Sequence, residues 1–136
     1  KYTDKKVFLT MGVDNLIKVF DESYYTKLDG GILEAFSKLF TKNITIFLYP
    51  MLRKNKIINS SKLIVSKSMK NLYKYFIKNT RIIDISDYNQ SYLSIFSSDV
   101  LKKIQSNEKG WENSLPDNVS DLIKEKKLFG LKELQR

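Results

Sequence analysis

The chain has 136 residues, 42% of them apolar and 12% aromatic, which is enough apolar surface for a folded core and too much for a disordered chain. It contains no cysteine and no histidine, which excludes a disulfide, a thiol nucleophile, and thiolate or imidazole metal ligands. No apolar run approaches the roughly 20 residues that span a bilayer, and no signal peptide is visible. We therefore expect an intracellular protein of the cytoplasm or nucleus, with no membrane partner.

The first predicted element is a strand over residues 6–11, a nearly continuous apolar run that ends at Gly12. Such a run is typical of a strand buried on both faces, as in a parallel sheet. Residues 14–20 predict a short helix, and residues 29–31 predict a turn. Residues 32–40 place five apolar side chains at helical spacing and predict a second helix.

A second strand is predicted over residues 43–49, which are β-branched and aromatic and are stopped by Pro50. Residues 51–60 are basic and predict a mobile loop. The longest periodic segment, residues 61–79, carries one apolar stripe and one lysine stripe and predicts a helix. Residues 81–85 predict a third strand.

The last predicted elements are helices over residues 98–105 and 116–127, with Pro116 near a first helical position and Gly130 as a terminator. Strands that alternate with helices predict an α/β fold with right-handed crossovers. Three parallel strands with flanking helices make a thin sheet. We therefore expect residues 1–136 to be the carboxyl-terminal part of one doubly wound, Rossmann-like domain whose amino-terminal half lies outside this sequence.

Polar and aromatic residues follow the end of the first predicted strand. Ligands of open parallel sheets bind at the carboxyl ends of the strands, where Gly12 would let a ligand approach the backbone. Asp14 would accept hydrogen bonds from ribose hydroxyls, and the rings of Tyr24 and Tyr25 would stack on a flat heterocycle. The alternative is that Gly12 only ends a strand, that Asp14 caps a helix and that the tyrosines belong to the core.

A second group of polar residues begins the helix predicted near residue 98. Ser97, Ser98 and Asp99 stand at its start, and Lys102 follows one turn later. Unpaired N–H groups, hydroxyls and a lysine at a helix start favour a phosphate, although Asp99 competes for the same donors. The alternative is an ordinary N-cap. We expect this group and the Gly12 group to converge on one nucleotide.

The net charge of +9 comes from one segment, because residues 35–83 hold eleven Lys or Arg and no Asp or Glu. A solvated lysine face explains this excess. A field that attracts a polyanion, either a nucleotide or a nucleic acid, explains it as well. The sequence contains no Walker loop, no Gly-x-Gly-x-x-Gly and no metal-spaced cluster, so no metal ligands are predicted.

Three segments carry a resemblance to a known family. They are residues 11–25 (MGVDNLIKVFDESYY), residues 95–104 (IFSSDVLKKI) and residues 115–130, which open with Leu-Pro and close with Leu-Phe-Gly. In order and spacing they resemble three motifs of the nicotinamide/nicotinate mononucleotide adenylyltransferases. These motifs are Gly-Phe-Asp-Thr with a following Tyr-Tyr, Ile-Ser-Ser-Thr-x-Ile-Arg, and the closing Val-Pro…Leu-Tyr-Gly. The divergent eukaryotic branch is the most similar.

The resemblance implies an enzyme with a nucleotidyltransferase fold that transfers the adenylyl group of ATP to the mononucleotide, with Mg²⁺ carried on the ATP phosphates. Gly12, Asp14, Tyr24 and Tyr25 would bind the mononucleotide. The triphosphate of ATP would bind residues 97–99 and Lys102.

The family motif that carries the catalytic histidines, Gly-x-Phe-x-Pro-x-His-x-x-His, is not in this sequence, and Lys102 and Asp99 replace the usual Arg and Thr. We therefore expect no catalytic residue in this chain and no activity from it alone. Two other interpretations remain: a nucleic-acid-binding module that uses the basic residues 53–81, and a relative that has lost catalysis and acts as a scaffold or sensor. A second copy of the chain remains a further candidate partner.

Overall fold

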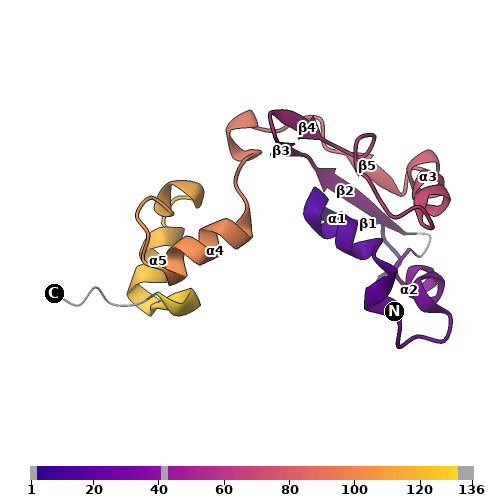
Figure 1. Cartoon of the computed structure of the whole chain (residues 1–136), viewed down its shortest axis with the longest axis horizontal. Coiled ribbons are helices and arrows are strands. Elements are labelled where there is room, and N and C mark those ends of the chain that lie inside the picture. Colours follow the sequence, from indigo (N-terminus) through magenta and orange to yellow (C-terminus); the bar gives the residue numbers. More distant parts are fainter. Residues whose placement is uncertain (1–2, 41–42, 132–136) are drawn as a thin grey trace. The chain divides into compact units, whose positions relative to one another are not determined.

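The computed structural model describes residues 3–40 and 43–131, and it divides the chain into two compact units (Figure 1). Unit 1 is Lys1–Asn89 and unit 2 is Gln90–Arg136. Each unit has its own core, so each is described by itself. In the described part of the chain, no helix has the length and apolar character that crossing a bilayer requires.

Unit 1 is built on a three-stranded parallel sheet with the order β1-β2-β5. Its strands are β1 (Val7–Gly12), β2 (Ile44–Tyr49) and β5 (Ile82–Asp84). The register places Gly12 opposite Tyr49 and Leu48 opposite Asp84, so the carboxyl ends of the three strands lie along one edge. The predicted mixed α/β architecture with three parallel strands and flanking helices is confirmed.

The helices of unit 1 share one aromatic cluster. They are α1 (Val13–Val19), α2 (Gly31–Leu39) and α3 (Lys70–Lys78). The ring of Phe20, just after α1, lies 5.0 Å from Phe36 of α2 and 5.1 Å from Tyr73 of α3, both edge-on. Because the connections advance across the sheet in one direction, right-handed crossovers place their helices on the same face.

The two faces of the sheet differ in burial. Ile46, Leu48 and Ile82 are buried on the face that the helices cover. On the other face Phe8 is 52% exposed and stacks on Phe47 with 4.8 Å between ring centroids. The prediction that the first strand is buried on both faces is therefore wrong for unit 1, because β1 is an edge strand and its helices cover one side only.

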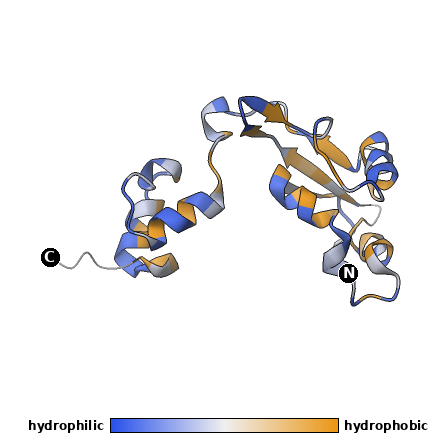
Figure 2. Ribbon diagram, viewed as in Figure 1, coloured by the Kyte–Doolittle hydropathy of each residue, from blue (hydrophilic) through white to orange (hydrophobic). Residues whose placement is uncertain are grey.

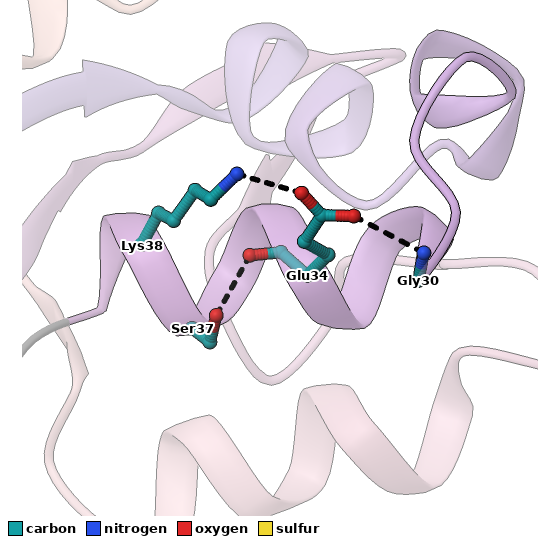
Figure 3. Close-up of polar contacts among 4 residues, drawn as sticks. All are labelled: Gly30, Glu34, Ser37 and Lys38. Carbon is teal, nitrogen blue, oxygen red and sulfur yellow. Dashed lines mark hydrogen bonds and ion pairs between the residues drawn. The ribbon is translucent and has the colours of Figure 1, made fainter.

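Two adjacent glycines begin α2 for structural reasons (Figure 3). The carboxylate of Glu34 accepts a hydrogen bond from the N–H of Gly30 at 3.1 Å and pairs with the Lys38 ammonium at 2.6 Å. These two donors, Lys38 first, hold the pKa of Glu34 below its usual value. A Cβ at Gly30 would lie 2.8 Å from the Cβ of Glu34, and Gly31 has φ +54°, so both positions favour glycine.

The basic loop predicted over residues 51–60 is instead a β-hairpin. Strand β3 (Met51–Arg53) pairs antiparallel with β4 (Lys56–Ile58). Its two turn residues, Lys54 and Asn55, have φ values of +48° and +57°. Two consecutive positive φ values are those of a type I′ turn, which matches the twist of paired strands.

The helix predicted over residues 61–79 is shorter than expected. Only Lys70–Lys78 is helical, and the preceding segment, which contains Ile64 and Val65, is irregular. The start of this segment is held by Ser60, whose N–H and hydroxyl donate to the Asp84 carboxylate at 2.9 and 2.6 Å. The lysines leave α3 largely blue in Figure 2.

The hydroxyl of Tyr73 completes this network by donating to the carbonyl of Ser60 at 2.7 Å. Tyr73 is 6% exposed. Burial, and then the negative charge of Asp84, raise the pKa of Tyr73 well above its ordinary value. At about pH 10 and above, the Tyr73 hydroxyl therefore stays protonated in the folded chain, whereas it loses its proton in the unfolded chain.

We expect Tyr73→Phe to lower the free energy of unfolding by about 1–2 kcal/mol at neutral pH, because the Ser60 carbonyl loses its donor. Because the pKa of Tyr73 is raised in the folded state, the free energy of unfolding of the parent should fall as the pH rises past about 10. The variant has no hydroxyl at this position and should lose less stability in that range. Urea unfolding on both sides of that pH measures both effects. Tyr24→Phe, at a tyrosine that is 64% exposed, is the control. Equal alkaline sensitivity in Tyr73→Phe and the parent would contradict the assignment.

Unit 2 is a small helical unit with α4 (Ser97–Gln105) and α5 (Val119–Lys126). Single 3₁₀ turns lie at Gln90–Tyr92, Glu112–Ser114 and Leu128–Gly130. The predicted helix over residues 98–105 is confirmed within one residue. The buried core consists of Val100, Ile104, Trp111 and Ile123.

The last predicted helix begins and ends differently from the expectation. It starts three residues after Pro116, because Asn118 takes a left-handed conformation with φ +66° immediately before it. It ends before Lys127, also left-handed at φ +50°, so Lys127 and not Gly130 terminates α5. Gly130 has φ +81° in the 3₁₀ turn that follows.

Candidate functional site

Gly12 stands at the carboxyl end of β1 and immediately before α1. Its φ of −79° and ψ of 164° are ordinary extended values, and a Cβ built there would meet no atom within 4 Å. In contrast to Gly30 and Gly31, neither the backbone nor the packing requires glycine at this position. The missing side chain leaves open space at the edge where parallel sheets bind their ligands.

The neighbouring residues along this edge are a carboxylate and two rings. Asp14 is exposed in the first turn of α1. Tyr49 ends β2 opposite Gly12, and its ring lies 6.3 Å from that of Tyr88. Asp84 ends β5, but its carboxylate is already occupied by Ser60. The edge thus offers an open backbone approach, the exposed carboxylate of Asp14 and a pair of tyrosine rings. Of these residues, the sequence had pointed to Gly12 and Asp14.

The structure places Tyr24 and Tyr25 at the other end of α1. This helix packs back against β1, and its seven residues rise about 10 Å away from the edge. The hydroxyl of Tyr25 donates to the Val19 carbonyl at 2.9 Å, and its ring meets Phe36 edge-on at 6.2 Å. Burial, and then the charge of Asp21, raise the pKa of Tyr25. Tyr25 is thus engaged in the fold, whereas Tyr24 is exposed.

The predicted phosphate group lies in unit 2, in the first turns of α4. Ser97, Ser98, Asp99 and Lys102 are all exposed. The N-cap position is Phe96, and no side chain caps the helix, so the ordinary N-cap interpretation of these residues is wrong. The hydroxyls of Ser97 and Ser98 therefore do not cap the helix, and the N–H of Asp99 donates to the Phe96 carbonyl at 3.0 Å.

Ser97 and Ser98 also line a cavity of about 590 Å³ in unit 2 whose remaining lining is almost entirely apolar. An apolar lining does not solvate a triphosphate. An anion at this helix start would therefore bind at the exposed end of α4 and not inside the cavity. Because these residues belong to unit 2 and the Gly12 edge to unit 1, their convergence on one nucleotide stays a prediction.

Within residues 3–40 and 43–131, the structure brings together no group of three or more acidic side chains that could hold a metal ion. The Mg²⁺ that the resemblance implies would be carried on the ATP phosphates; it stays a prediction, and we assign no step to the ion.

A cavity of about 590 Å³ in unit 1 includes four lysines of the basic segment 53–81, which the sequence offered as an alternative, nucleic-acid-binding site. It lies between the irregular segment before α3 and the exposed side of α3, and its lining includes Ile64, Lys67, Lys70, Lys74 and Lys78. The lysine spacing was visible in the sequence. The apolar part of the lining was not visible in the sequence, because it depends on the segment before α3 being irregular and not helical.

No protein family model, no curated protein and no solved structure matches this chain. What the structure defines is therefore a class: a mixed α/β unit on a three-stranded parallel sheet, followed by a small helical unit.

Proposed function

We propose that the carboxyl edge of the sheet in unit 1 is a mononucleotide site, and that the chain is part of a Rossmann-like nucleotidyltransferase related to the pyridine mononucleotide adenylyltransferases. The observation that carries the proposal is Gly12: a glycine that the fold does not require, with open space around it, at the end of a parallel strand. The exposed Asp14, two residues later, supports it as the acceptor for ribose hydroxyls.

In the proposed reaction, a phosphate oxygen of the nicotinamide or nicotinate mononucleotide attacks the α-phosphate of ATP. A new phosphorus–oxygen bond forms, the bond between the α- and β-phosphates breaks, and pyrophosphate leaves. Such a reaction depends on positioning and charge stabilisation and needs no protein nucleophile. Gly12 would let the mononucleotide lie close to the protein backbone, and Asp14 would accept hydrogen bonds from its ribose hydroxyls.

Gly12→Val tests the proposal with little risk to the fold, because a Cβ there meets no neighbour and φ is unstrained. We expect the variant to fold normally and to bind nicotinamide mononucleotide at least about tenfold more weakly than the parent, a loss of about 1.4 kcal/mol. Asp14→Asn should weaken binding in the same direction. Isothermal titration calorimetry measures the affinities, and circular dichroism checks the fold.

The matched control is Thr45→Val, which introduces the same side chain near the amino end of β2 and should leave binding unchanged. Absence of mononucleotide binding by the parent chain, or equal binding by Gly12→Val, would overturn the proposal. Pyrophosphate release is a separate readout, and we expect none from this chain, because it has no histidine.

A further inference from the structure

The cavity beside α3 forms a groove with one charged wall. We define the basic groove by Leu63, Ile64, Val65 and Ile77 together with Lys67, Lys70, Lys74 and Lys78, all of which line it. It lies entirely within unit 1, and its lining includes neither Gly12 nor Asp14.

The charge of the groove is of one sign. Residues 35–83 contain no Asp or Glu, so the four lysines have no acidic neighbour in their own segment. Three carboxylates from other elements lie against this segment. Asp84 accepts hydrogen bonds from Ser60, and Glu22 accepts one from Ser68. Asp21, together with Glu22, lines a smaller neighbouring pocket that includes Ile64 and Val65, but neither carboxylate lines the groove itself. No lysine of the groove belongs to an ion pair that the structure shows within residues 3–40 and 43–131. The wall therefore attracts an anionic partner.

Part of the lining of the groove is aliphatic. Ile64 is 86% exposed, although isoleucine is usually buried, and it stands beside the half-buried Val65. Ile77 of α3 adds a further half-buried aliphatic side chain to the same lining. A partner that brought only charge would leave this surface in contact with water. The groove is complementary to a partner with both carboxylates and apolar side chains.

The groove lacks the features that favour nucleic acid. Among the described residues that line it, Tyr73 is the one with an aromatic ring, and that ring is 6% exposed with its hydroxyl bound to Ser60. Single-stranded nucleic acids are held by exposed rings on which bases stack, in addition to basic charge. The cations are lysines without the planar fork that arginine offers to phosphates.

We propose that the basic groove binds an acidic amphipathic peptide segment of a partner protein. Apolar side chains of the peptide cover Ile64 and its aliphatic neighbours, and its carboxylates face the lysines of α3. This is the helix-in-groove mode of recognition, with charge complementarity setting the orientation.

Fluorescence anisotropy with three labelled probes tests the proposal on the full chain. The first is a peptide of about 15 residues with leucine on one helical face and glutamate on the other. The second is a peptide of the same length and charge with serine in place of leucine. The third is an oligothymidylate of about 15 nucleotides. At about 0.15 M salt, we expect the leucine peptide to bind at least about tenfold more tightly than either other probe.

Two variants separate charge from apolar contact. Ile64→Asn should weaken binding of the leucine peptide and leave the serine peptide unchanged, because it removes only the apolar contact. The double variant Lys70→Glu with Lys74→Glu should weaken binding of both peptides. Lys27→Glu with Lys109→Glu changes the net charge equally at exposed positions outside the groove and should leave binding as in the parent.

The outcomes that overturn the proposal are distinct. Equal affinity for the two peptides would show a surface that recognises charge alone. Tightest binding of the oligothymidylate would identify a nucleic-acid surface instead. Unchanged binding in both groove variants, with thermal melts like the parent's, would place the peptide elsewhere on the chain.

Discussion

Replacing Phe20 by alanine should lower the free energy of unfolding of unit 1 by about 3–5 kcal/mol. Phe20 is 1% exposed, and its ring makes edge-on contacts with Phe36, Tyr73 and Phe76 at 5.0, 5.1 and 6.0 Å. These contacts join the end of α1 to α2 and α3. The substitution removes the buried ring and leaves a cavity where the three helices meet. The variant therefore loses the free energy gained by burying the ring, and the cavity adds a further cost.

Urea unfolding followed by far-ultraviolet circular dichroism measures this effect. The control is Tyr24→Ala, which also removes an aromatic ring close to α1, but one that is 64% exposed. We expect this control to change stability by no more than about 0.5 kcal/mol. Similar losses for the two variants would show that the aromatic cluster does not hold the helices of unit 1 together.

Ile104→Ala should strongly destabilise unit 2, with a loss of about 2–5 kcal/mol in its free energy of unfolding. Ile104 is 3% exposed and belongs to a core of four buried residues. A core of this size has little surplus stability, so one cavity of this kind should unfold a large share of the molecules.

Trp111 makes the experiment specific, because it is the one tryptophan of the chain and lies in the same core as Ile104. Its fluorescence in a urea titration therefore reports on unit 2. Leu101→Ala, on the same helix but at a side chain that is 38% exposed, is the matched control and should cost about 1 kcal/mol or less. A tryptophan transition that is unchanged in Ile104→Ala would contradict the assignment of this core.

Much of unit 1 could be predicted because its signals are local. The strands ending at Gly12 and Tyr49 are apolar or β-branched runs with clear stops, and the predicted boundaries of α2 agree within one residue. The hairpin β3–β4 was missed because its turn is formed by Lys54 and Asn55, without the glycine that usually marks a type I′ turn.

Other features depend on contacts that no local pattern shows. Residues 61–69 share the lysine and apolar spacing of α3, yet Ser60 bonds to Asp84, which lies 24 residues away, and the helix starts only at Lys70. The exposed position of Ile64 follows from this irregular segment. The position of Gly12 and Asp14 at a strand end could be predicted because the end of a strand is readable in sequence, whereas the basic groove depends on tertiary structure.

The order of the strands has a consequence for synthesis on the ribosome. Sheets made of parallel strands assemble slowly when a strand must wait for a partner that emerges much later. Here β2 adds beside β1 and β5 adds beside β2, so in the described sheet each added strand pairs with a strand that has already been synthesised. We therefore expect the sheet to grow in the direction of translation, with unit 1 able to close once Asp84 and Ser60 have both left the exit tunnel and before the helices of unit 2 are complete.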